Sequence, residues 1–268
     1  MSTYKRLLRP WRCLVYEGRN TVLGIGAIRR NRVFEDSEVE RLRPSLTPGR
    51  STPRVLVVIP TYRRPDGARR AVESALAQTF SDIAVIVVDD GAGLPVLPAD
   101  PRLAAVSLRR NTATLGLVRN VGIRLVDSEF VAFLDDDNVW TPDHVAAAVA
   151  ALDADPGLAG VYTSVRRERS DGSQIDVLGA PFDARRLRWD PFIDANSIVV
   201  RRSHDRGFSV LPRTKSTLPK EDWEYVWRLS RRGRIEHVPA VTVRYAVNPQ
   251  SYFTHWTDDY ATPGRRDA

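Results

Sequence analysis

The chain has 268 residues, 43% of them hydrophobic and 27% charged, a composition typical of a globular protein with room for one large α/β domain or two small ones. Its single cysteine, Cys13, excludes an intramolecular disulfide and, with only four histidines, a Cys/His zinc cluster. A reducing cytoplasm is therefore the expected compartment. The net charge of +7 lies in the first 54 residues, which hold 12 Lys and Arg against five Asp and Glu. The rest of the chain is neutral, so no nucleic-acid partner is expected.

Residues 1–53 are predicted to be a basic N-terminal extension that ends in a Pro-, Gly- and Ser-rich linker. The segment from Leu7 to Tyr16 mixes apolar and basic residues, which is typical of a helix that docks or lies on a membrane surface. A peripheral contact with the inner membrane face would follow, but a short cap packed on the main domain explains the same pattern. The apolar run from Thr21 to Ile28 is too short to span a membrane. Its Gly24-Ile25-Gly26 is only a partial dinucleotide fingerprint, because no third glycine or preceding strand accompanies it.

Residues 54–165 alternate between continuous apolar runs and amphipathic segments. Such alternation indicates βαβ units and a parallel sheet flanked by helices, which is a Rossmann-like, nucleotide-binding half. The last predicted helix has Thr141 as its N-cap and Pro142 at its first position. Strands are predicted at 55–59, 83–88, 104–108 and 130–134, and helices at 65–78, 117–126 and 142–154.

The pattern changes after about residue 157. A strand at 158–165, a turn at 170–173 and a strand at 174–178 predict a hairpin. A strand at 196–200, a helix at 221–232 and a strand-rich segment at 235–247 follow. Residues 166–247 are therefore predicted to form a mixed, acceptor-binding half, and residues 248–268 a C-terminal tail.

Polar residues follow three of the predicted strands. Phe130–Leu134 runs directly into Asp135-Asp136-Asp137, while Pro60-Thr61-Tyr62 and Asp89-Asp90 end two others. The carboxyl ends of parallel strands meet at one edge of a sheet, so we expect these clusters to converge. Three adjacent acids repel one another unless positive charge lies among them, and a divalent cation carrying a phosphorylated ligand would supply it. Asp89-Asp90 alone would fit a solvated turn.

Four motifs that include these clusters occur along the chain in the same order as in a known protein family. The set resembles the family 2 glycosyltransferases and their GT-A fold, over residues 54 to about 245, and the acidic run with Thr141-Pro142-Asp143 is similar to the spore-coat-polysaccharide type. Arg63 and Ala92 depart from the Asn and Ser that the family usually has there. The motifs are Val58-Ile59-Pro60-Thr61-Tyr62-Arg63-Arg64, Val87-Val88-Asp89-Asp90-Gly91, Gly116-Leu117-Val118-Arg119-Asn120-Val121-Gly122 and Phe133-Leu134-Asp135-Asp136-Asp137.

The resemblance implies a nucleotide-diphospho-sugar donor and a Mn²⁺ or Mg²⁺ ion. Asp90 would accept a hydrogen bond from the base, and Asp137 would ligate the metal, with Asp135 as a second ligand. His237 or His255 would be a third, less favoured ligand, since an isolated histidine is more often structural. Arg64 would approach phosphate or remain a surface arginine. The full set implied to contact the donor is Pro60, Thr61, Tyr62, Arg64, Asp90, Arg119, Asp135 and Asp136.

The catalytic residues implied by the resemblance lie in Glu221-Asp222, at the start of a predicted helix. Asp222 would take the proton of the acceptor hydroxyl, and Glu221 would orient the acceptor. The reaction would be an inverting, metal-dependent transfer in the synthesis of a polysaccharide, glycoconjugate or glycosylated natural product. The chain has no Gln-x-x-Arg-Trp signature after this motif and no predicted membrane span, which favours transfer of a single sugar.

Two alternatives stay open. A nucleotidyltransferase also uses carboxylates and a metal on a similar sheet, but residues 60–67 offer only one glycine for a phosphate loop. A non-catalytic protein that binds a nucleotide-sugar or an anionic surface would use the basic N-terminal arm.

Overall fold

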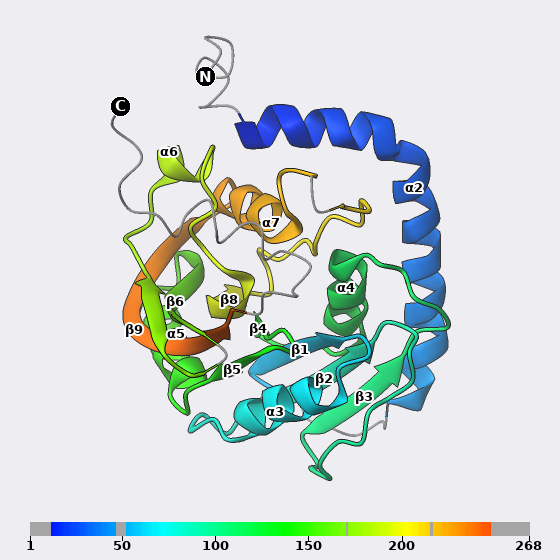
Figure 1. The fold of residues 1–268 in the computed structure, drawn as a ribbon, viewed down its shortest axis with the longest axis horizontal. Helices are drawn as coiled ribbons and strands as arrows, with labels where there is room; N and C mark the ends of the chain where they lie inside the picture. Colours follow the sequence, from blue (N-terminus) through cyan, green and yellow to red (C-terminus); the bar gives the residue numbers. More distant parts are fainter. Residues whose placement is uncertain (1–11, 47–51, 170, 215–216, 248–268) are drawn as a thin grey trace.

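The computed structural model of the protein describes residues 12–46, 52–169, 171–214 and 217–247 (Figure 1). The predictions made for residues 1–11, for the linker at 47–51, for the tail at 248–268 and for His255 fall outside these ranges.

The described residues contain one sheet of nine strands, in the order β3-β2-β1-β4-β8-β6-β9-β5, with β7 paired to β6. The strands β3, β2, β1 and β4 run parallel, and β8 joins β4 antiparallel. The predicted parallel half and mixed half are therefore both present. The strands are β1 (Val55–Thr61), β2 (Ile83–Asp89), β3 (Leu103–Ser107), β4 (Phe130–Phe133), β5 (Asn138–Trp140), β6 (Leu158–Glu168), β7 (Gln174–Leu178), β8 (Ile198–Arg201) and β9 (Arg234–Ala246).

Helices cover both faces of the sheet, because the parallel strands are apolar on both sides. On β1, Leu56 and Val58 point to one face while Val57 and Ile59 point to the other, as the two-residue period of a strand requires. The first face packs on α2, α4 and α7, and the second on α3 and α5. The helices are α2 (Arg12–Leu42), α3 (Pro65–Leu76), α4 (Leu115–Leu125), α5 (His144–Ala154), α6 (Ala184–Leu187) and α7 (Glu221–Ser230).

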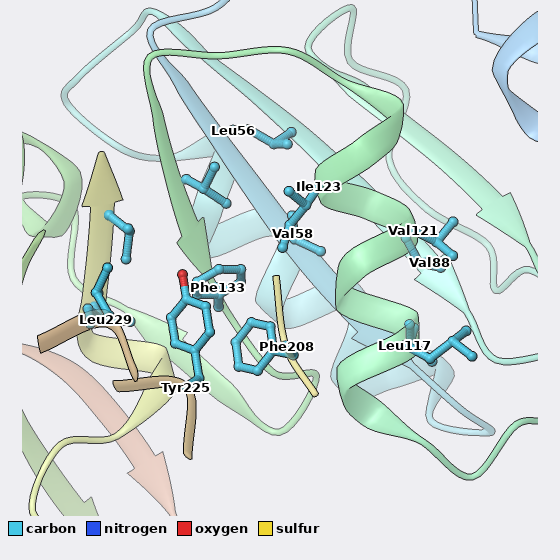
Figure 2. Close-up of a cluster of buried hydrophobic side chains, with 14 of the residues drawn as sticks. Leu56, Val58, Val88, Leu117, Val121, Ile123, Phe133, Phe208, Tyr225 and Leu229 are labelled. Carbon is cyan, nitrogen blue, oxygen red and sulfur yellow. The ribbon is translucent and has the colours of Figure 1, made fainter. Parts of the chain in front are cut away.

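Aromatic side chains join the two halves of the domain within the first core, which is the core between the sheet and the helices α2, α4 and α7. Figure 2 shows Phe133 of β4 beside Phe208 and Tyr225, with α4 on the other side. Phe133 meets Phe208 edge to face at 5.0 Å between ring centroids, and Phe208 stacks on Tyr225 at 4.1 Å. These contacts tie α7 to the end of β4, from which the acidic run begins.

The structure departs from the predicted elements at two places near the acidic run. Helix α5 begins at His144 rather than Pro142, and its N-cap is Asp143 rather than Thr141, with no side-chain capping bond. The Thr141 hydroxyl bonds to the Asp143 carboxylate instead of capping the helix. A short strand, β5, was not predicted, because three residues carry no readable period; it is held by pairing with β9.

Within the predicted N-terminal extension, residues 12–42 form one 31-residue helix, α2, which packs along the domain (Figure 1). Cys13, Val39 and Leu42 are buried in the first core. The side chains of Asn20 and Asn31 donate hydrogen bonds to the carbonyls of Leu218 and Val210, at 2.7 and 2.8 Å. The inner face of α2 therefore packs against the main domain. Within the described ranges, no helix is long and apolar enough to cross a bilayer.

Candidate active site

The three acids form the turn between β4 and β5, at the carboxyl edge of the parallel strands. The Thr61 hydroxyl donates to Asp136 at 2.8 Å. One nitrogen of Arg64 contacts both Asp136 and Asp137, at 3.1 and 2.7 Å. Burial raises the pKa of Asp136 to about 6, against the lowering effects of Thr61 and Arg64.

Asp135 points toward the second half of the domain. It accepts a hydrogen bond from Arg119 at 2.6 Å and from the Asn196 amide at 3.2 Å, and its own backbone N–H donates to Asn196 at 2.5 Å. The positive charge that the acidic run requires is therefore supplied in part by the chain itself, through Arg64 and Arg119.

Helix α3 approaches the acidic turn so closely that only glycine fits at position 67. A Cβ there would lie 2.3 Å from the backbone oxygen of Asp136. We expect Gly67→Ala to lower the free energy of unfolding by about 1–3 kcal/mol, because the turn must shift to accept the methyl group. Gly18→Ala is the control: Gly18 is helical and its Cβ would meet nothing within 4 Å, so this change should stabilise by about 0.5–1 kcal/mol. Urea denaturation measures both, and equal effects of the two would contradict the close approach.

The two acids at the end of β2, Asp89 and Asp90, have different roles. One oxygen of Asp89 accepts bonds from the backbone of Ala92 and Gly93 and from the Ser107 hydroxyl, so Asp89 closes the turn. Asp90 instead holds the turn that follows β3, by accepting from the backbone and hydroxyl of Thr112 and from the backbone of Ala113. Burial raises the pKa of Asp90.

A cavity of about 440 Å³ collects most of the predicted donor residues. Its wall also contains backbone and side chains from residues 111–118 and from residues 209–213 of the second half. The predicted residues that line it are Pro60, Thr61, Tyr62, Arg64, Asp90, Asp135, Asp136, Asp137 and Glu221. The exception is Arg119, which lines the neighbouring cavity.

This second cavity, of about 520 Å³, contains Asp222, Glu221 and Lys220 from the start of α7. Trp189 and Phe192 add aromatic surface to it. Leu115, Asp135, Glu221 and Tyr245 line both cavities and so form the wall between them.

Arg119 lies under that wall and is fully buried. It contacts Asp135 at 2.6 Å and Glu221 at 3.9 Å, so one cation links the acidic run to the start of α7. Its guanidinium also lies 4.8 Å from the centre of the Phe208 ring. In the described part of the chain, neither its Nε nor its Nη1 has a hydrogen-bond partner.

Asp222 lies in the first turn of α7, where its carboxylate accepts a 2.7 Å bond from the backbone N–H of Trp223. Burial, together with the charges of Glu221 and Asp194, raises its pKa to about 7. A carboxylate with a pKa near neutrality is suited to accept a proton at physiological pH.

The carboxylates fit a small divalent cation only if a ligand completes its shell. Among the described residues, no group of three or more His, Cys, Asp and Glu is arranged to hold a metal ion. Asp135 and Asp137 line the same cavity, and Mg²⁺ or Mn²⁺ bound to a diphosphate needs only one or two protein carboxylates. His237 does not join them: it bonds to Ser164 at 2.9 Å and stacks on Tyr162.

Sequence reasoning missed three residues of the site. Asn196 orients Asp135, Asp194 bonds to Asn196 at 2.7 Å, and Tyr245 lines both cavities. The signal for the first two was the polar run Asp194 to Ser197 directly before an apolar strand. Nothing in the sequence marks Tyr245, because β9 brings it there from the far end of the domain.

Residues 56–198 match the family model described as "Glycosyl transferase family 2". The chain belongs to that family. The succinoglycan biosynthesis protein ExoW of Rhizobium meliloti is 40% identical over 37% of this chain and 34% of its own length. ExoO of the same organism is 32% identical over 58% of this chain and 46% of its own length. This family 2 chain thus spans less than half the length of either relative.

Solved structures share the fold of this family 2 domain. The Staphylococcus aureus protein TarS, residues 1–349 in complex with UDP-GlcNAc, superposes with a TM-score of 0.59, 17% identity and coverage of 75% of this chain and 60% of that one. A mannosyltransferase from Pyrobaculum calidifontis, in complex with GDP-Man and Mn²⁺, covers 87% of this chain and 70% of its own, with a TM-score of 0.54 and 16% identity. The GT-A fold expected from the sequence is confirmed.

Proposed function

We propose that the protein is an inverting, metal-dependent glycosyltransferase that moves one sugar from a nucleotide-diphospho-sugar to an acceptor hydroxyl. The observation that carries the proposal is the shared wall, which separates a cavity lined by the acidic run from a cavity that contains Asp222. The first would bind the donor and the second the acceptor. In this proposal, residues 54–165 supply most donor contacts and residues 166–247 most acceptor contacts.

The donor would lie with its base near Pro60, Thr61 and Tyr62 and with its diphosphate near the acidic run. Among the described residues, one oxygen of Asp90 accepts a hydrogen bond from the backbone of Ala113 alone, so that oxygen can still accept a bond from a base. Asp137 and Asp135 would hold the Mn²⁺ or Mg²⁺ ion. When bound there, such an ion neutralises the charge that develops on a diphosphate leaving group.

The transfer step places a proton on Asp222. The acceptor hydroxyl gives its proton to the carboxylate as its oxygen bonds to the anomeric carbon, and the nucleoside diphosphate leaves from the opposite face. Glu221, on the wall between the cavities, would orient the acceptor. Arg119 would fix the positions of Glu221 and Asp135 relative to each other, because it contacts both.

A thermal-shift screen of UDP-, GDP- and dTDP-sugars, each with and without Mn²⁺, tests the proposal. A ligand that binds the folded state raises its apparent stability, by about 2.7 kcal/mol at a hundred times its dissociation constant. We expect one nucleotide class to raise the melting temperature, and to do so more strongly with Mn²⁺. No shift with any of these sugars would contradict the proposal.

The raised pKa of Asp222 predicts a pH profile. The ionised carboxylate is the active base, so kcat/KM for the transfer should rise with pH and level off above about 7. Because the folded-state pKa lies above the usual value, the protonated form favours folding, and this contribution is lost as pH rises toward 7. Denaturation of wild type and Asp222→Asn at pH 5 and pH 8 checks the direction of this effect. Between pH 5 and pH 8, the free energy of unfolding should fall more for the wild type than for the variant. A flat rate profile would contradict the assignment.

A further inference from the structure

The outer face of α2 carries large apolar side chains that the domain does not cover. The inner side of the same helix is packed by Cys13, Val39 and Leu42, so its orientation is fixed. The exposed fraction is 74% for Val22, 72% for Leu23 and 70% for Val33, far above that of a packed residue. We define the outer face of α2 by its exposed apolar residues, which are Leu14, Val15, Val22, Leu23, Ile25 and Val33.

The middle of this face protrudes. Helix α2 bends about halfway along its length and wraps around the domain (Figure 1). Gly24 and Gly26 lie near the middle of the α2 sequence, and paired glycines are common where helices bend. Gly24 packs on Leu211, since a Cβ there would lie 2.3 Å from the leucine Cδ1. The helix approaches the domain at Gly24, while the neighbouring side chains of Val22, Leu23 and Ile25 are exposed to solvent.

The charge on this face has one sign. From Gly18 to Phe34 the sequence contains no Asp or Glu, and Arg19, Arg29 and Arg30 are exposed among the apolar residues. Over the described ranges, no acidic side chain lies within ion-pairing distance of these three arginines. Glu17, which precedes this stretch, pairs with Arg213, and the buried Glu35, which follows it, pairs with Arg32 and Arg124. An apolar, cationic surface is complementary to the boundary between anionic headgroups and acyl chains.

We propose that the outer face of α2 binds the surface of an anionic lipid bilayer. Val22, Leu23 and Ile25 enter the headgroup–acyl boundary, and the flanking arginines contact lipid phosphates. The segment beneath the bend, residues 209–213, also lines the first cavity, so the bilayer would lie beside the donor site. The proposal is independent of sugar transfer, and its test does not use activity.

Sedimentation of the full chain with vesicles tests the proposal, using phosphatidylcholine alone or mixed with phosphatidylglycerol. We expect pelleting only with the anionic vesicles, weakening as salt rises. Arg29→Gln/Arg30→Gln should lower the partition coefficient about 30-fold, at about 1 kcal/mol for each arginine. Val22→Ser/Leu23→Ser/Ile25→Ser should lower it by at least roughly tenfold, since each serine removes apolar surface from the boundary.

Matched controls change the same residue types elsewhere. Val96 is 90% exposed in the loop after β2, so Val96→Ser should pellet like wild type. Arg70→Gln/Arg185→Gln removes two exposed arginines outside α2 and should have little effect. Circular dichroism confirms that each variant is folded. Absence of vesicle binding, or binding that the α2 variants leave unchanged, overturns the proposal. A dimer in solution that the same variants abolish would assign the face to a second copy and also overturn it.

Discussion

Asp222→Asn is expected to abolish sugar transfer while leaving donor binding intact. The amide keeps the shape of the side chain and its oxygen can still accept the bond from the backbone of Trp223, but it cannot take a proton at neutral pH. Loss of a general base lowers kcat by about 100- to 10,000-fold. The measurement is kcat in a coupled assay for nucleoside diphosphate release, alongside the dissociation constant of the donor.

The control for that variant is Asp171→Asn, because Asp171 is exposed in the turn of the β6–β7 hairpin. It removes one carboxylate without touching either cavity and should leave kcat unchanged. Transfer retained in Asp222→Asn would show that another group takes the proton. The candidate for that group would then be Glu221, the other carboxylate at the very start of α7.

Asp137→Asn is expected to remove the cation dependence of donor binding. Asp137 lines the first cavity and contacts Arg64, and the amide can retain a hydrogen bond there, so the fold should be preserved. The weaker metal ligand should lower donor affinity in Mn²⁺ by roughly 100-fold, the scale of the several kcal/mol that a metal ion supplies in charge stabilisation. Calorimetric titration of the donor, with Mn²⁺ and with EDTA, measures this.

Asp127→Asn is the matched control for the acidic run, because the Asp127 side chain is 85% exposed and lies before β4 rather than after it. Its donor affinity should equal that of wild type in both conditions. If Asp137→Asn bound the donor as wild type does, with and without EDTA, the carboxylate would have no role in holding a metal. Arg64 would then be the cation that the acidic run provides for the diphosphate.

The parallel half of the fold was readable from the sequence because its signals are local and strong. The apolar runs at Val55–Ile59 and Phe130–Leu134 are buried on both faces and bounded by polar turns, so few other structures suit them. Alternation with helices then predicts a parallel sheet, in which the carboxyl ends of the strands meet at one edge. Most of the residues predicted at this edge do line one cavity.

What the sequence hid depends on contacts between distant segments. The packing of α2 needs the carbonyls of Val210 and Leu218, more than 170 residues away along the chain. The charge balance of the acidic run likewise comes from Arg64 and Arg119, which the spacing alone cannot orient. Tyr245 reaches the wall between the cavities only because β9 pairs with both β5 and β6. Pairing of this kind is set by the whole fold rather than by a local pattern.

The proposal that the donor binds in the first cavity and the acceptor in the second is tested most directly by one calorimetric comparison in Mn²⁺. The donor identified by thermal shift is titrated into wild type, Asp137→Asn and Asp222→Asn. Two separate sites predict that Asp222→Asn binds the donor with the affinity of wild type, while Asp137→Asn binds it roughly 100-fold more weakly. Equal loss in both variants, or no loss in either, would contradict the assignment of the donor to the acidic run and of the acceptor to the cavity of Asp222.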